Sequence, residues 1–286
     1  MYSDTDNHSI ERGFLLHVFH RQNKDRDIIY AVGKLECGET FGLMDTRWRP
    51  FFYCRVSDRE VVQGRVGVHR AVIVESSFKT IDSEPVLRVE CPRVSDLRRL
   101  ERHLEQDGIR TYEADLNFGL HCLMESGIRG VVRIEGSWQV GKGVNRVYTD
   151  PQLAPDDFEP DLALLVLDIE TAPDASEVYA VSLVGSGPAA QHRVEEIHLV
   201  GAPAAGDPDQ LCCHVDERSL LEALAGRVRS IDPDILSGWN IIDFDLKVLQ
   251  TRFEAHELDF NLGRTQDASW YRESKIWGGS RMVIYG

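Results

Sequence analysis

The stretch LALLVLDIET at residues 162–171 constrains the fold of this chain more than any other. It is a nearly continuous apolar run ending in acids, as expected for a strand buried on both faces of a sheet. Because side chains alternate along a strand, Asp168 and Glu170 lie on one side and Ile169 on the other. Two adjacent carboxylates repel each other, and a divalent cation such as Mg²⁺ or Mn²⁺ removes that penalty. The alternative is a strand that ends in two solvated acids.

The residues that follow alternate between short apolar runs and amphipathic stretches. They predict two strands, a helix, a strand and a second helix, at 178–185, 195–200, 217–230, 234–240 and 244–258. Asp216 can cap the first of these helices and Asp243 the second. Three strands, a helix, a strand and another helix is the order of a ribonuclease H-like fold.

Asp245 gives this order a chemical meaning. It follows the predicted strand 234–240 and lies in the first turn of the next helix. In a ribonuclease H-like fold that strand lies near strand 162–171, so Asp245 can reach the same metal as Asp168 and Glu170. An acid at the start of a helix is also favourable by itself, because it faces the positive end of the helix dipole. The three acids together favour a metal site.

The first half of the chain has a different character. Strands are expected at 13–21, 28–36, 49–56, 71–81 and 85–92. A helix is expected at 95–108, with Ser95 or Asp96 as its cap and Gly108 at its end. This pattern predicts a small mixed sheet with a covering helix, and nothing in it resembles a catalytic site.

A polar, proline-rich segment at 150–161 separates the two halves. It predicts a small mixed α+β domain at 1–155 and an α/β domain at 156–286. Residues 1–150 carry a net charge of −1 and residues 151–286 one of −14, which by itself argues mildly against nucleic-acid binding. Acidic nucleases are an exception, because their carboxylates hold cations that meet the phosphates.

Composition narrows the location of the protein. The chain has no run approaching the roughly 20 apolar residues of a membrane span, and its polar N-terminus lacks a signal-peptide core. Its six cysteines show no zinc-site spacing and are expected to be reduced thiols. We therefore expect a cytoplasmic protein with no membrane partner.

Two segments closely resemble the family B DNA polymerases. LDIET at 167–171 is similar to their first exonuclease motif, and DPDILSGWNIIDFDLKVLQTR at 232–252 to the second, with Asn240, Phe244 and Asp245 at the motif positions. GIRTYEADLNFGLHCLMESGI at 108–128 resembles the segment that precedes the exonuclease domain. The run 263–286 looks most like the bacterial members. The resemblance covers essentially the whole chain.

The resemblance implies a DNA polymerase that proofreads by a two-metal 3′→5′ exonuclease, acting in DNA replication and repair. Asp168, Glu170 and Asp245 would be the metal and catalytic ligands for Mg²⁺ or Mn²⁺. Asn240 and Phe244 would contact the single-stranded 3′ end of DNA, although Phe244 can equally be a core residue and Asn240 a turn residue. Trp239 is interpreted as packing. The parent would bind primer–template and deoxynucleotides and be associated with the bacterial nucleoid, and the first half would be its N-terminal domain.

One expected motif is missing. The third exonuclease motif, Tyr-x-x-x-Asp, does not follow Asp245, because Tyr271 has Lys275 at that offset and the sequence ends one residue after Tyr285. The polymerase motifs are absent as well. We therefore expect an exonuclease domain that is incomplete at its C-terminus, in a fragment with weak metal binding and very low activity.

Two other hypotheses stay open. The chain can be a stand-alone exonuclease of this fold, with Asp259 or Asp267 as the fourth ligand. It can also be a non-catalytic module whose first half binds single-stranded nucleic acid, although the near-neutral charge of that half makes strong non-specific binding unexpected.

Overall fold

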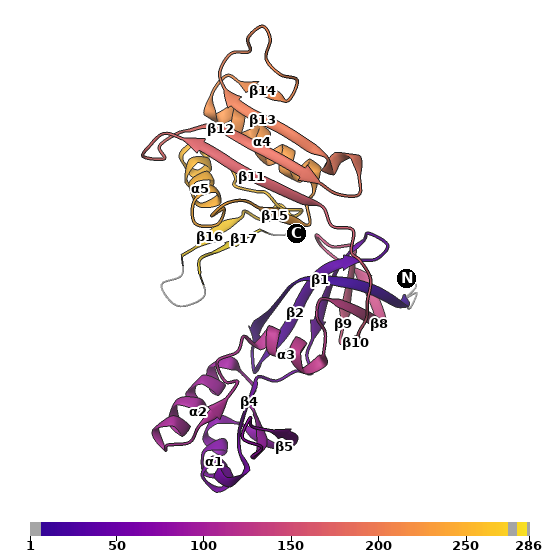
Figure 1. Cartoon of the computed structure of the whole chain (residues 1–286), viewed down its shortest axis with the longest axis vertical. Coiled ribbons are helices and arrows are strands. Elements are labelled where there is room, and N and C mark those ends of the chain that lie inside the picture. Colours follow the sequence, from indigo (N-terminus) through magenta and orange to yellow (C-terminus); the bar gives the residue numbers. More distant parts are fainter. Residues whose placement is uncertain (1–6, 274–278, 285–286) are drawn as a thin grey trace. The chain divides into compact units, whose positions relative to one another are not determined.

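The computed structural model describes residues 7–273 and 279–284, and the chain divides into two compact units, Met1–Pro160 and Asp161–Gly286 (Figure 1). Both units mix strands and helices. The boundary predicted from the sequence, residue 155, is the last residue of a strand of the first unit, β10 (Gln152–Pro155). The segment expected to be a linker therefore contains a strand.

The larger sheet of the first unit closes on itself. Its strands are β1 (His8–Asn23), β2 (Arg26–Leu35), β3 (Thr40–Asp45), β8 (Val131–Val140), β9 (Arg146–Thr149) and β10. The order is β1-β2-β3-β9-β8-β10, and β8 also pairs with β1, so five of the strands form a ring. Phe41, Ile134 and Tyr148 fill its interior and are completely buried.

A second sheet of the first unit carries two helices. It contains β4 (Phe51–Arg55), β5 (Val72–Lys79), β6 (Pro85–Glu90) and β7 (Thr111–Tyr112), in the order β5-β6-β4-β7. The helices of this unit are α1 (Arg59–Val66), α2 (Val94–Gln106) and α3 (Phe118–Ser126), with single turns η1 (Val56–Asp58) and η2 (Gly67–His69). Neither Ser95 nor Asp96 caps α2, because the carboxylate of Asp27, at the start of β2, accepts from the Val94 N–H at 2.8 Å.

The second unit is a five-stranded mixed sheet with two helices. Its strands are β11 (Leu164–Thr171), β12 (Val178–Ser186), β13 (Val194–Val200), β14 (Leu211–His214) and β15 (Ile235–Ser237), in the order β14-β13-β12-β11-β15. Its helices are α4 (Glu217–Ile231) and α5 (Asp245–Ala255), with the turn η3 (Ala190–His192) and a hairpin of β16 (Trp270–Arg272) and β17 (Arg281–Val283). Strand β15 pairs in parallel with β11, which confirms the expected ribonuclease H-like arrangement.

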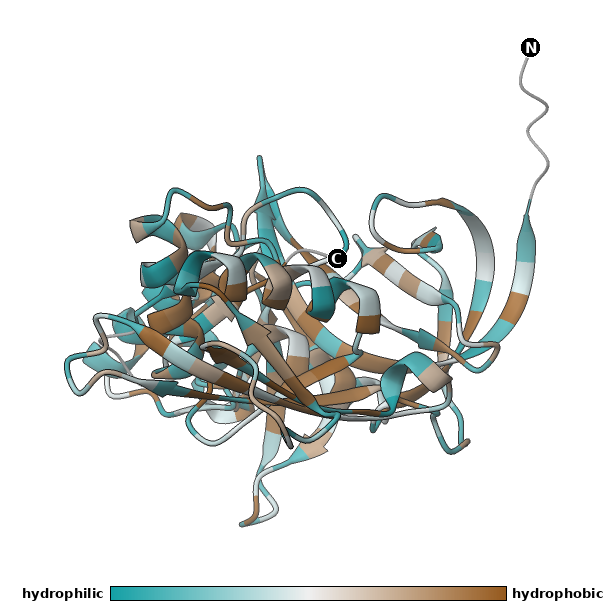
Figure 2. Cartoon of the chain, turned by 90° about the horizontal axis from the view of Figure 1, so that it is seen from above, coloured by the Kyte–Doolittle hydropathy of each residue, from teal (hydrophilic) through white to brown (hydrophobic). Residues whose placement is uncertain are grey.

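Strand β11 is buried on one face only, so the prediction of burial on both faces is wrong. Leu165, Leu167 and Ile169 are buried in the core with α4 and α5, whereas Val166, Asp168 and Glu170 alternate with them on an exposed face. Figure 2 shows brown and teal bands along several strands, where apolar and polar residues follow one another. The run is continuously apolar because two residues of the exposed face, Leu164 and Val166, are apolar as well. Its apolar sequence therefore does not show that this face is covered.

A buried carboxylate ties the two helices of the second unit to the sheet. Glu217, at the start of α4, accepts from the Val178 N–H at 2.8 Å, from Arg252 Nε and Nη2 at 2.8 and 2.6 Å, and from His256 Nε2 at 2.6 Å. Burial alone would raise the pKa of Glu217, but these hydrogen bonds outweigh it and hold the pKa at about 2. Asp216 caps α4 as expected, accepting from the Ser219 N–H at 2.8 Å.

Two remaining expectations concern the whole chain. All six cysteines have free thiols, and Cys54, Cys91 and Cys122 are buried packing residues. None of the helices in residues 7–273 and 279–284 is long and apolar enough to cross a membrane.

Candidate active site

The acids predicted from the sequence lie around one end of strand β11. Asp168 and Glu170 share its exposed face, as their spacing requires. Asp245 is the first residue of α5, and its Oδ1 accepts from the Ile169 N–H at 3.1 Å, between the other two acids in sequence. This bond places the start of α5 directly against the strand that carries Asp168 and Glu170.

Asp245 is an unusual carboxylate because it is only 1% exposed and only one of its two oxygens has a hydrogen-bond partner among the described residues. Its Oδ2 is buried and has no hydrogen-bond partner among the described residues. Burial raises the pKa of Asp245, and the negative charge of Asp168 raises it further. A buried oxygen without a partner is costly unless a ligand pairs with it. A cation between Asp245 and Asp168 would satisfy that oxygen and neutralise the repulsion.

The described residues do not form a complete metal cage. No three Asp, Glu, His or Cys side chains among them lie close enough to hold one ion together. Mg²⁺ usually keeps several waters and takes only one or two carboxylates from the protein. Asp168 and Asp245 fit that kind of site, and a shared metal that also includes Glu170 stays a prediction.

The loop between β15 and α5 is pressed against the same strand. A Cβ on Gly238 would lie 2.4 Å from the Leu167 carbonyl oxygen, one residue before Asp168. Asn240 has a φ of 54°, in the left-handed region that Asn tolerates better than most residues. Its carbonyl accepts from the Asp243 and Phe244 N–H groups at 3.1 and 3.0 Å. The contact of Gly238 with Leu167 and the turn at Asn240 thus determine the backbone path that leads to Asp245.

Replacing Gly238 by alanine is expected to destabilise the second unit by about 1–3 kcal/mol, because the new methyl group overlaps backbone that has no room to shift. Urea unfolding measures the loss. Gly226→Ala is the matched control, since a Cβ there meets no atom within 4 Å. Equal stability of Gly238→Ala and the wild type would contradict the close packing described here.

Three large apolar side chains of this loop are exposed to solvent, although such side chains are usually buried. Trp239 is 91% exposed, Phe244 41% and Ile242 38%. The interpretation of Trp239 as a packing residue is therefore wrong, and Phe244 is not a core residue of the helix. An exposed tryptophan beside a candidate metal site was missed because the sequence around it reads as a buried strand end. Its neighbours Gly238 and Asn240, both turn residues, were the available signal.

Asp243 does not cap α5. Phe244 occupies the cap position without a side-chain hydrogen bond, and Asp243 instead accepts from the Tyr271 hydroxyl at 2.8 Å. Hydrogen bonds from Ser280 and Tyr271 lower the pKa of Asp243. The Tyr271 N–H donates to Gln250 Oε1 at 2.6 Å. These bonds attach the β16–β17 hairpin to the start of α5. Lys275 and Tyr285, which the third exonuclease motif was compared with, lie outside the described residues.

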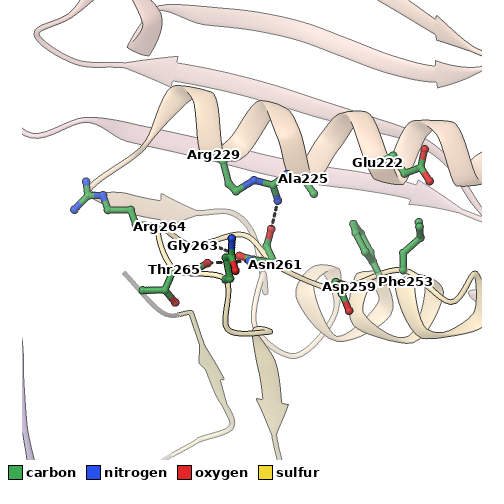
Figure 3. A pocket seen from close by; sticks show the side chains of 11 residues that line it. Glu222, Ala225, Arg229, Phe253, Asp259, Asn261, Gly263, Arg264 and Thr265 are labelled. Atoms are coloured by element: carbon green, nitrogen blue, oxygen red, sulfur yellow. Dashed lines mark hydrogen bonds between the residues drawn. The ribbon is translucent and has the colours of Figure 1, made fainter. Parts of the chain in front are cut away.

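The alternative fourth ligands are placed differently. Asp259 lines a hollow of about 480 Å³ beyond the C-terminal end of α5, together with Phe253 and Leu258 (Figure 3). Asp245 is at the opposite end of this helix, whose 11 residues span about 15 Å at ~1.5 Å per residue, and no group of three possible metal ligands occurs among the described residues. Asp259 therefore does not complete a site at Asp245. Asp267 accepts from the Thr265 hydroxyl within its own loop at 2.9 Å.

Comparison with known proteins agrees with this arrangement. Residues 109–282 match the family described as DNA polymerase family B, exonuclease domain. DNA polymerase II of Escherichia coli (strain K12) is 30% identical over 240 residues, which cover 80% of this chain and 29% of the relative. A DNA polymerase of Archaeoglobus fulgidus is 25% identical over 271 residues, 89% of this chain and 33% of the relative.

A solved structure supports the fold. The family B DNA polymerase from the hyperthermophilic archaeon Pyrobaculum calidifontis superposes with a TM-score of 0.69 at 20% identity, over 91% of this chain and 34% of that one. The chain thus spans about a third of the length of the relatives it matches. Because the matched family region 109–282 is more than half of the sequence, and a polymerase 30% identical is matched over 80% of it, this chain belongs to the family B DNA polymerases.

Proposed function

We propose that the second unit is a 3′→5′ exonuclease that removes nucleotides from an unpaired DNA end, as the proofreading part of a replication and repair polymerase. The observation that carries the proposal is the buried, unpartnered Oδ2 of Asp245 beside Asp168. Asp168, Glu170 and Asp245 would hold Mg²⁺ or Mn²⁺. Membership of a family whose model describes an exonuclease domain supports the same assignment.

The reaction is hydrolysis of the terminal phosphodiester. Water adds to phosphorus and the bond from phosphorus to the 3′ oxygen breaks. The products are a nucleoside 5′-monophosphate and a strand that is one nucleotide shorter and ends in a 3′ hydroxyl. Bound divalent cations would supply the charge that activates the water and stabilises the leaving oxygen. Asp168 and Asp245 would hold those cations through their negative charge, and the Ile169 N–H keeps the Asp245 carboxylate in position.

The exposed side chains beside the acids fit a single-stranded end. Trp239 and Phe244 present aromatic faces to solvent on the loop that leads into Asp245. Aromatic stacking holds any base without sequence preference. Asn240 lies between them, and its amide can bond to a base edge or a phosphate. Duplex ends keep their terminal bases stacked in pairs, so these residues favour frayed or mismatched ends.

An exonuclease assay tests the proposal. The full chain is incubated with 5′-labelled single-stranded DNA in Mn²⁺, and the products are resolved by length. We expect a slow ladder shortened from the 3′ end, absent with EDTA and reduced at least tenfold in Asp168→Ala. Its rate should be low because no Tyr-x-x-x-Asp motif follows Asp245 in this sequence. Cleavage that persists in Asp168→Ala, or that starts from the 5′ end, would contradict the assignment.

Replacing Trp239 by alanine is expected to weaken single-stranded DNA binding by about tenfold, because one stacking contact is worth roughly 1–3 kcal/mol. Fluorescence anisotropy with a labelled oligothymidylate in Ca²⁺ measures the affinity. Trp270→Ala, another partly exposed tryptophan of the same unit, is the matched control. An unchanged affinity in Trp239→Ala would show that the exposed ring does not contact DNA.

A further inference from the structure

Two histidines join the edge strand of the second unit's sheet to the strand beside it. His198 lies on β13 and His214 on β14, and the Nδ1 atom of His198 is 2.9 Å from Nε2 of His214. The two ring planes are nearly parallel, 12° apart, with their centroids 5.1 Å apart. The facing nitrogens thus share one hydrogen, which is donated by whichever ring carries it.

Strand β14 is a short strand at the edge of the sheet. It has four residues, all partly exposed, and it follows a fully exposed segment at 201–210. It pairs in parallel with β13, and the Gly201 N–H donates to the His214 carbonyl at 2.8 Å. It ends two residues before Asp216, the cap of α4. Short edge segments with exposed hydrogen bonds open at a low cost in free energy, so one further bond between side chains has a large effect on opening.

The groups that face the histidine pair offer little compensation for a second positive charge. Nε2 of His198, which is 5% exposed, lies 3.5 Å from Glu196 Oε2 on the same strand, longer than an ordinary hydrogen bond. Both Glu196 oxygens accept from Arg227 of α4, at 2.6 and 2.8 Å. Cys212 of β14 is the register partner of His198, and burial raises the pKa of its thiol, which is therefore uncharged at neutral pH. The residue beside His198 on β12 is Val181, which is apolar.

The bond between the two imidazoles survives only while one of the facing nitrogens carries no hydrogen. The neutral pair and the singly charged pair both keep it, whereas a second proton sets two N–H groups and two positive charges against each other. Burial and the charge of His198 lower the pKa of His214. In a detached β14 both imidazoles would reach water, where the ordinary pKa is about 6.5. The detached form therefore binds more protons in mild acid than the paired form, and acid favours detachment.

From these observations we propose that His198 and His214 form a pH-sensitive latch, which keeps β14 on the sheet at neutral pH and releases it in mild acid. Release uncovers the hydrogen-bonding edge of β13 and loosens the chain that leads into the Asp216 cap of α4. Strands β12 and β13 separate β14 from β11, which carries the acids of the candidate active site. The latch is therefore independent of the proposed exonuclease, because it shares no residue with that site.

Hydrogen exchange of the full chain in EDTA, followed by mass spectrometry of a peptide that covers β14, tests the latch between pH 7 and pH 5. The protection factor is the measured quantity, because it removes the intrinsic pH dependence of exchange. Since detachment takes up one proton in this range, the protection of β14 should fall about tenfold per pH unit below about pH 6. The protection of β12, in the middle of the same sheet, should stay constant. A wild-type profile of β14 that is flat from pH 7 to pH 5 would overturn the proposal.

The double variant His198→Asn with His214→Gln separates the latch from other effects of pH. Asparagine places an oxygen near the position of Nδ1 and glutamine an amide nitrogen near that of Nε2, so one hydrogen bond is kept without a titrating group. We expect the protection of β14 in this variant to be independent of pH, whether it is high or low. His8→Gln, which removes an exposed histidine of the first unit, is the matched control and should keep the wild-type profile. A tenfold fall per pH unit that persists in the double variant would contradict the latch.

Discussion

Replacing Asp245 by asparagine is expected to stabilise the metal-free protein by about 1 kcal/mol while abolishing metal-dependent activity. The wild-type carboxylate is buried next to Asp168, and its charge is uncompensated without a cation. Asparagine keeps an oxygen for the Ile169 N–H and turns an amide toward Asp168, which accepts hydrogen bonds. A residue that costs stability and is needed for function is the signature of a ligand site.

The stability difference between Asp245→Asn and wild type should depend on pH, because it follows the ionisation of Asp245. Burial raises the pKa of Asp245 in the folded protein. A raised carboxyl pKa costs stability at neutral pH, and the cost disappears as the pH falls below the unfolded-state value of about 3.9. The difference between Asp245→Asn and wild type, measured by urea unfolding in EDTA, should therefore be largest near pH 7 and small near pH 4. Asp259→Asn is the control. A large loss of stability in Asp245→Asn at pH 7 would mean that the carboxylate is structural.

Replacing Glu217 by glutamine is expected to destabilise the second unit by about 3 kcal/mol at neutral pH. The pKa of Glu217 is held at about 2 by its hydrogen bonds, against an ordinary value of 4.5. That difference corresponds to about 3 kcal/mol. A glutamine would also turn an N–H group toward Arg252 or His256, leaving buried donors facing each other.

The stabilisation by Glu217 has a defined pH window. A lowered carboxyl pKa contributes fully above the unfolded value of 4.5 and is lost as the pH falls toward 2. Urea unfolding of Glu217→Gln and wild type should thus differ strongly at pH 7 and converge toward pH 2–3. Glu222→Gln, which removes an exposed pair with Arg218 on the same helix, should change stability by only about 0.3 kcal/mol. Similar effects of the two substitutions would refute the network as a source of stability.

Periodicity and motif spacing predicted the architecture of the second unit because its elements obey local rules. The Asp216 cap, the leucines of α4 and the apolar run of β11 are each readable within a few residues. The parallel pairing of β15 with β11 followed from element order. What could not be predicted depends on contacts far apart in sequence. Asp27 caps α2 from 67 residues away, and the exposure of the β11 face depends on which elements pack against it.

The first unit was harder to predict, since its elements are short and its pairings are long-range. Strand β3, helix α3 and the β8–β9 hairpin were missed although each has a local signal. Asn117, for example, caps α3 by accepting from the Gly119 and Leu120 N–H groups. The ring closure of β1 with β8 joins residues more than 100 positions apart, and no local pattern contains it.

The candidate site also combines features that the sequence predicts with features that depend on the folded structure. The sequence named Asp168, Glu170 and Asp245, and their order along the chain was enough to expect a common location. The buried, unpaired oxygen of Asp245 and the exposure of Trp239 could not be predicted, because both are properties of the folded loop. The loop that carries Trp239 and leads into Asp245 packs at Gly238 against Leu167, a contact between residues 71 positions apart.

Mn²⁺ binding to the full chain, followed by electron paramagnetic resonance of the free ion, tests the central claim most directly. We predict saturable binding by wild type, a loss of at least tenfold in affinity in both Asp168→Asn and Asp245→Asn, and no change in Asp259→Asn. Wild-type affinity in Asp245→Asn, or a loss in Asp259→Asn alone, would contradict a metal site at the start of helix α5.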